Sequence, residues 1–222
     1  MNSEYYEPIH NPHKYATLAK QWLDDNPLFL DTETTGLKDD AEVVEISIID
    51  STGKPLLDTL VKPVYPIPQE AIDIHGITNE RVAEAPTWLE IHEEFCQLIQ
   101  NRTLLIYNVD YDIRILKQTI SFHDFKNRHS TDQLRNFQEA YRNLKSCCCV
   151  MKLFAAFFGQ WDDYREDWKW QKLTKAADYM GVEIEGKAHR ALADCQMTLG
   201  VLQGMANTLP EKPETKSNKT CQ

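Results

Sequence analysis

The chain has 222 residues and a formal net charge of −10, with 42% hydrophobic and 26% charged residues. This length suits one domain with a sizeable core, with or without tails, and the composition is that of a globular protein. The acidic balance argues against a large electropositive surface for nucleic acid, because phosphate contacts need lysine and arginine. It leaves open an enzyme that holds a few nucleotides through bound cations.

No apolar stretch is long enough to span a membrane, and the first residues lack the apolar core of a signal peptide. We therefore expect a cytoplasmic protein without a membrane partner. In chain order, Asn11-Pro12 predicts the start of a helix that ends before Asn26-Pro27. Three strands should follow as an antiparallel meander, with the sequences LFLDTE, AEVVEISIID and KPLLDTLVKPV.

Helices and strands alternate in the rest of the chain. Apolar residues at helical spacing predict helices over 87–100, 110–120, 151–159, 169–180 and 192–209, and a further helical spacing runs from Leu134 to Leu144. The short apolar runs TLLIYNV and SCCCV, residues 103–109 and 146–150, predict buried strands. An antiparallel three-strand start followed by this alternation predicts an α/β fold with a mixed central sheet flanked by helices.

Two unusual stretches have competing interpretations. Cys147–Cys149 form a run without a CxxC pair, and neighbouring strand residues face opposite ways, so we expect reduced, mostly buried thiols and not a zinc site. In WDDYREDWKW, residues 161–170, the side chains of Trp161, Tyr164 and Trp168 could stack on bases. A packed loop or a partner surface is the interpretation that we favour.

The first predicted strand ends in two like charges. Asp31 and Glu33 are two residues apart, so a strand places both carboxylates on one face, where they repel and where burial would raise their pKa values. A bound cation would relieve the repulsion. Taken alone, the pair also fits a strand end that turns at Thr35-Gly36.

Two further junctions carry chemically capable residues. Asn108 ends the predicted strand before Asp112, which begins the next helix, and His189 and Asp194 flank the start of the last helix. Helix positions five apart lie roughly 140° around the axis from each other, so this pair converges only if His189 is on the approach loop. Four carboxylates and a histidine suit oxygen-rich coordination of hard divalent cations beside a base.

At these residues the sequence resembles a known family. DTETTGL, NVDYD and HRALAD are similar, in order and spacing, to the three motifs of the DnaQ-like DEDDh 3′-to-5′ exonucleases, which have an RNase H-like fold. IHGIT, residues 74–78, resembles the segment found in bacterial polymerase III epsilon-type proofreading exonucleases. The similarity covers about residues 27 to 207. One departure is Tyr111, which stands where the family commonly has phenylalanine.

The resemblance implies a role for each matching residue. Asp31, Glu33, Asp112 and Asp194 would be ligands of two Mg²⁺ or Mn²⁺ ions, and His189 would be the general base. The residues expected to hold the terminal nucleotide are Thr34, Thr35, Gly36, Leu37, His75, Asn108 and Tyr111.

The implied activity is metal-dependent removal of 5′-mononucleotides from the 3′ end of nucleic acid, with DNA favoured and a single-stranded or frayed end as substrate. An RNA exonuclease of the same family is the alternative, since nothing in the motifs reads a 2′-hydroxyl. A non-catalytic binding module is a different class, but it would be expected to lose one of the five residues. We expect a helical extension over 1–26, the exonuclease domain over 27–209 and a disordered tail over 210–222, with a replication or repair protein as a possible partner.

Overall fold

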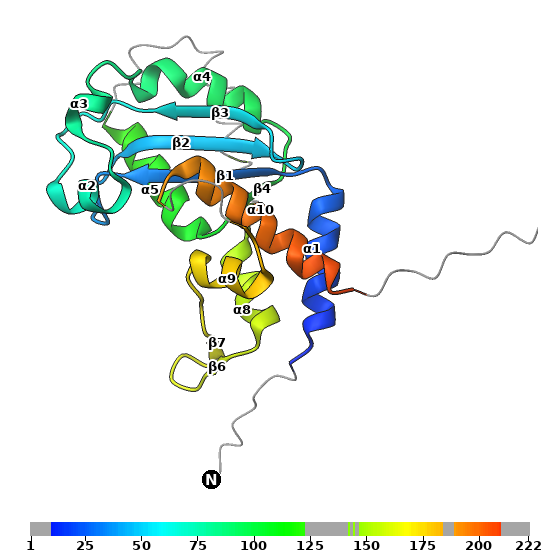
Figure 1. The fold of residues 1–222 in the computed structure, drawn as a ribbon. Helices are drawn as coiled ribbons and strands as arrows, with labels where there is room; N and C mark the ends of the chain where they lie inside the picture. The colour runs from blue at the N-terminus through cyan, green and yellow to red at the C-terminus, as the bar shows by residue number, and fades with distance from the viewer. Residues whose placement is uncertain (1–9, 123–141, 143, 145–146, 184–188, 210–222) are drawn as a thin grey trace, which may run out of the picture.

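The computed structural model describes residues 10–122, 142, 144, 147–183 and 189–209. Its central sheet has the strand order β3-β2-β1-β4-β5 (Figure 1). The strands are β1 (Leu28–Thr34), β2 (Val43–Asp50), β3 (Pro55–Leu60), β4 (Leu104–Ile106) and β5 (Cys148–Cys149). β1, β2 and β3 pair antiparallel, whereas β4 and β5 run parallel to β1. The predicted mixed sheet with an antiparallel start is confirmed.

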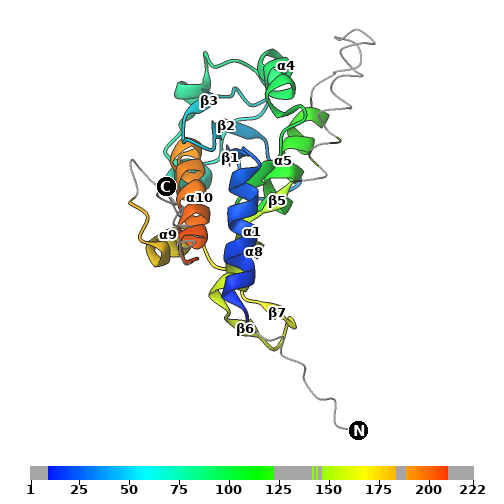
Figure 2. The same cartoon turned by 90° about the vertical axis from the view of Figure 1, so that its right-hand side faces the viewer.

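Helices cover both faces of this sheet (Figures 1 and 2). One face packs against α4 (Trp88–Ile99) and α5 (Val109–Ser121). The other packs against α1 (Pro12–Asp24), α8 (Val150–Phe158), α9 (Leu173–Met180) and α10 (Ala191–Asn207). Two short helices, α2 (Gln69–His75) and α3 (Asn79–Val82), bury a smaller cluster around Val44.

The residues of β1 alternate between the two cores. Leu28 and Leu30 pack with α4 and α5, and Phe29 packs with α8 and α10. All three are almost completely buried, and each such side chain contributes about 1.5–3 kcal/mol on leaving water. This burial fixes the register of the strand, because a one-residue slip would exchange its two faces. Asp31 and Glu33 therefore continue the Phe29 face, toward α10.

The first helix is part of the core and not a free extension. Asn11 caps α1 by accepting a hydrogen bond from the Lys14 amide at 3.2 Å, and Pro12 occupies the first turn. Ala16 and Ala19 are fully buried, and their small side chains let α1 pack closely on α8 and α10.

Several local expectations were wrong. No helix is predicted between the third strand and residue 87, but α2 and α3 lie there, and the helix expected to begin at Lys169 begins at Leu173 instead. WDDYREDWKW forms a hairpin of β6 (Trp161–Asp162) and β7 (Asp167–Trp168), with the ring centroids of Trp161 and Trp168 5.2 Å apart. The thiols of Cys147–Cys149 are reduced but partly exposed, because β5 is a two-residue strand at the sheet edge.

Other expectations fall outside the described residues. These are the helical spacing from Leu134 to Tyr141 and the tail over 210–222. Within the described part of the chain, no helix is both long enough and apolar enough to cross a membrane.

Candidate active site

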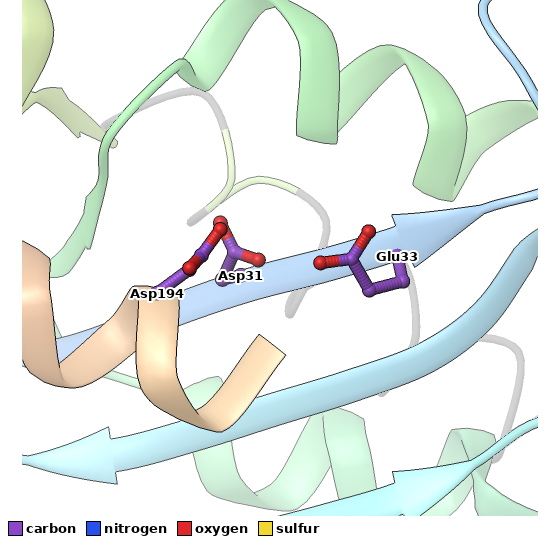
Figure 3. Close-up of side chains that lie close together, drawn as sticks. All are labelled: Asp31, Glu33 and Asp194. Atoms are coloured by element: carbon purple, nitrogen blue, oxygen red, sulfur yellow. The ribbon is translucent and has the colours of Figure 1, made fainter. Parts of the chain in front are cut away.

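Three carboxylates meet above β1. Asp31 and Glu33 come from the strand and Asp194 from the first turn of α10, and one oxygen of each lies within 4.8 Å of the others. Figure 3 shows the three carboxyl groups pointing into a shared space between the strand and the helix. The expected same-face arrangement of Asp31 and Glu33 is confirmed, and α10 brings a third acid to it from far along the chain.

A fourth acid approaches from the edge of β1 that pairs with β4. Asp112 is buried in the first turn of α5 and accepts a hydrogen bond from Thr32 Oγ1 at 2.8 Å. In the described part of the chain, β4 pairs with β1 only as far as Leu30. Beyond that point the β4 side of β1 is open, and α5 begins there. Asp31, Glu33, Asp112 and Asp194 are called the carboxylate cluster below.

The carboxylate cluster is strained electrostatically in the absence of a cation. Burial, followed by the charges of neighbouring acids, raises the pKa of Glu33 from 4.5 to about 8. Burial also raises the pKa of Asp112 to about 7 and that of Asp194 to about 6. For Asp31, burial and then the charge of Asp112 raise the pKa well above its ordinary value. Ionising all four groups together therefore costs free energy that a cation would return.

The residues present fit a divalent cation. Asp194 Oδ1 is buried and has no hydrogen-bond partner among the described residues, which is unusual for a carboxylate oxygen. A hard cation accepts such oxygens as ligands, and carboxylates are the donors that Mg²⁺ and Mn²⁺ prefer. The unpartnered Asp194 oxygen and the raised pKa values of the four acids therefore both indicate a cation site at the carboxylate cluster.

His189 lies just before α10, as the convergence with Asp194 requires. Its φ of 63° is in the left-handed region, which is uncommon for a residue other than glycine and is concentrated at functional sites. The charge of His189, followed by its backbone amide, lowers the pKa of Asp194, against the larger effect of burial. The His189 side chain is exposed, so it is open to a substrate.

The loop after β1 uses its hydroxyl groups internally. Thr35 Oγ1 accepts from the Glu42 amide at 2.9 Å, and Thr34 Oγ1 lies 3.0 Å from the Gly36 carbonyl oxygen. Leu37 is 78% exposed at the end of this turn. Of these expected substrate-binding residues, only Leu37 presents a largely exposed side chain, while Thr34, Thr35 and Gly36 offer mainly backbone.

The hydroxyl of Tyr111 makes hydrogen bonds that a phenylalanine could not make. Tyr111 Oη lies 2.6 Å from Thr34 Oγ1 and donates to the Gly36 carbonyl at 2.9 Å. It thereby ties the first turn of α5 to the loop that carries Leu37. The sequence analysis noted the departure from phenylalanine and did not predict these hydrogen bonds.

Two more side chains of α5 hold the same loop. Arg114 Nη2 donates to the Leu37 carbonyl at 3.1 Å, and Gln118 Nε2 donates to the Lys38 carbonyl, also at 3.1 Å. Together with Tyr111 these residues are called the α5 clamp. Sequence reasoning missed them, although polar residues at helical spacing beside the second motif were a usable signal.

His75 and Asn108 lie beside the site without joining the carboxylate cluster. The His75 ring is 3% exposed, with Nε2 3.3 Å from the Thr34 carbonyl and Nδ1 accepting from the Ile77 amide at 2.9 Å. Burial lowers the pKa of His75, so the neutral ring supports the strand end. Asn108 is the partly exposed N-cap of α5, and its carbonyl accepts from the Asp112 amide at 3.2 Å.

Comparison with known proteins agrees with this geometry. The chain is 49% identical over 188 residues to the uncharacterized exonuclease CP81 of Escherichia phage 186, covering 85% of this chain and 92% of that one. It is 35% identical over 100 residues to the DNA polymerase III subunit epsilon of Rickettsia prowazekii, covering 42% of this chain and 44% of the subunit.

A solved structure shares the fold. Exonuclease X in complex with 5′ overhanging duplex DNA superposes with a TM-score of 0.56 at 23% identity, covering 82% of this chain and 91% of that one. The exonuclease family model, named for RNase T, matches residues 28–202. This span contains all three motifs and every acid of the carboxylate cluster, so the resemblance seen in the sequence is confirmed and the chain belongs to the exonuclease family.

Proposed function

We propose that this protein is a 3′-to-5′ exonuclease that removes 5′-mononucleotides from a single-stranded or frayed DNA end with the help of two divalent cations, Mg²⁺ or Mn²⁺. One observation carries the proposal: Asp31, Glu33 and Asp194 place oxygens within 4.8 Å of one another, and the charge of buried Asp112 acts on Asp31 beside them. Asp31, Glu33, Asp112 and Asp194 would hold the cations. When bound, such ions stabilise the charge that develops on the phosphate and on the leaving oxygen.

His189 supplies the base. A neutral imidazole accepts the proton of the attacking water as the water oxygen bonds to phosphorus and the bond from phosphorus to the 3′ oxygen breaks. The terminal nucleotide then leaves with its 5′-phosphate. The exposed position of His189 beside Asp194 supports this role.

The loop after β1 would hold the last nucleotide. The α5 clamp fixes its carbonyl oxygens, which leaves the Leu37 side chain and the adjoining backbone to contact the sugar and base. With a net charge of −10, few phosphates are expected to be held. The enzyme should therefore release its substrate between cuts.

The preference for DNA is part of the proposal. It is supported by the epsilon-subunit relatives and by a structural neighbour solved with DNA. An RNA exonuclease is the second candidate. The epsilon relatives also support a replication partner, and a cytoplasmic location is part of the proposal. We further propose residues 27–209 as the catalytic domain, to whose core α1 (Pro12–Asp24) contributes.

End-labelled substrates test the proposal directly. Single- and double-stranded DNA and RNA are incubated with Mg²⁺, and the products of 5′-labelled and 3′-labelled strands are compared. A ladder that shortens from the 3′ end and releases 5′-mononucleotides is expected, fastest on single-stranded DNA. Cleavage of covalently closed circular single strands would show an endonuclease, and faster loss of RNA would select the second candidate.

A further inference from the structure

A fifth buried carboxylate lies next to the carboxylate cluster and is built differently. Glu45 on β2 is 3% exposed and stands directly opposite Glu33 in the antiparallel pairing of β1 and β2. Like charges opposite each other on neighbouring strands destabilise a sheet, and a buried ionised group needs a partner. Glu45 therefore needs a partner of its own, separate from the proposed cations.

Arg190 is the partner of Glu45. Its Nε lies 2.9 Å from Glu45 Oε2 and 3.1 Å from Oε1, and its Nη2 also donates to Oε1. The amide of Ala191, the first residue of α10, donates to Oε2 at 3.0 Å. One buried carboxylate thus binds both the side chain of Arg190 and the backbone of the residue after it.

This contact falls at the place where the chain enters α10. His189 has a φ of 63°, Arg190 has an extended backbone with φ −137° and ψ 128°, and Ala191 is helical. The Arg190 carbonyl accepts from the Asp194 amide at 3.0 Å within the helix start, and the contacts with Glu45 add a connection from this segment to β2. A planar guanidinium bound at two points fixes orientation as well as position.

We propose that Arg190 and Glu45 form a positioning pair that holds His189 and the first turn of α10 against β1, so that the base and Asp194 face the other acids. The inference rests on the proposed function. Arg190 is a positioning residue and not a catalytic one, because its guanidinium is bound to Glu45 and not directed at a substrate. Arg190 also offsets part of the negative charge that Glu45 places beside Glu33.

Guanidinium rescue tests the pair. Arg190→Ala should lower kcat on single-stranded DNA at saturating Mg²⁺ by about 10- to 100-fold, the cost of a small misplacement of reacting groups. KM should change little, because Leu37 and its loop are untouched. Millimolar guanidinium should restore much of the lost kcat and methylammonium much less, since only the planar ion reproduces the fork.

Two further variants make the test specific. Arg102→Ala removes an arginine that donates to the Asn26 carbonyl at 2.8 Å, just before β1 and β4 begin and outside the motif residues. The kcat of this control should stay near wild type and should not respond to guanidinium. Arg190→Ala could fail to fold because it leaves Glu45 buried and unpaired. Glu45→Gln with Arg190→Ala removes that charge and should fold, yet remain slow.

The outcomes separate this inference from the proposed function. Wild-type kcat in Arg190→Ala, or in the folded double variant, overturns the inference alone. So does a loss of kcat in folded Arg190→Ala that guanidinium fails to reverse. A wild-type protein that degrades none of the DNA or RNA substrates overturns the proposed function and the inference together.

Discussion

The carboxylate cluster and the loop after β1 differ in how far their polar atoms are satisfied by the protein itself. In the carboxylate cluster, burial and repulsion raise the pKa values of four acids, and one buried oxygen of Asp194 lacks a partner within the described chain. In the loop, the carbonyl groups of Gly36, Leu37 and Lys38 accept hydrogen bonds from the α5 clamp. The loop holds its shape without help, whereas the cluster needs a ligand before all its acids can ionise. The difference separates a preformed loop from a cluster that is completed only when a cation binds.

The largest expected effect comes from removing one charge of the cluster. Asp31→Asn should reduce exonuclease activity by about 10³-fold or more, because a lost ligand removes several kcal/mol of transition-state stabilisation. In EDTA at alkaline pH the same variant should melt at a higher temperature than wild type, since one buried like charge is gone, with about 2–4 °C gained per kcal/mol. Product release and thermal melting measure the two effects.

The metal-site interpretation predicts both a loss of activity and a gain in melting temperature for this variant, and each can be contradicted separately. A purified Asp31→Asn protein with wild-type activity would remove the metal-site interpretation. A lower melting temperature in EDTA would show that the cluster is satisfied without a cation.

Removal of the base should cost less. His189→Ala should lower kcat by about 10² to 10⁴-fold, the usual contribution of a positioned base, while Mg²⁺ binding measured by calorimetry stays close to wild type. Asp194→Ala is the matched variant, because it removes a ligand from the same helix start and should weaken Mg²⁺ binding. Near-normal turnover in His189→Ala would place the base elsewhere.

The pH dependence of stability should reveal the cluster's strain. A raised carboxyl pKa means that the folded state holds its proton longer, so stability is greatest below the unfolded pKa and falls as pH rises through the folded one. Glu33 moves from 4.5 to about 8 and Asp112 from 3.8 to about 7. The lowered pKa of His75 makes stability rise with pH, but only at pH values below its ordinary pKa of 6.5.

Melting temperature in EDTA should therefore fall between about pH 6.5 and about pH 8.5. Saturating Mg²⁺ should largely remove this fall by stabilising the ionised acids. A melting temperature that is flat or rises over the same range without Mg²⁺ would contradict the assigned strain.

The smallest effect should come from the loop. Tyr111→Phe removes a single oxygen from the α5 clamp and should cost about 0.5–1.5 kcal/mol of stability, the usual net contribution of a hydrogen bond. KM for a single-stranded end should rise while kcat changes less, because the loop and not the carboxylate cluster is loosened. Tyr164→Phe, at a position 96% exposed on the β6–β7 hairpin, is the matched control. Equal effects at both positions would show that the clamp does not restrain the loop.

The sequence predicted the parts of the site that depend on periodicity. Asp31 and Glu33 share a face because β1 alternates, and Asp112 and Asp194 lie in first turns where apolar periods begin. Short elements were missed, since α3 and the β6–β7 hairpin are too brief to show a period. The pairing of Glu45 with Arg190 joins residues 145 positions apart, and no local pattern specifies it. A single acid inside the run VVEISII, residues 43–49, was its only trace in the sequence.

The length of β4 has a consequence for how such a site can arise or disappear. This strand pairs with β1 at only three positions, and its last residue, Ile106, pairs with Leu30. Two more paired residues would advance the chain by about 7 Å along the sheet edge. The following helix would then begin beyond the acids, and its aspartate could not reach them. In this architecture an insertion in a plain apolar strand, which itself carries no motif residue, would abolish activity as completely as the loss of a ligand.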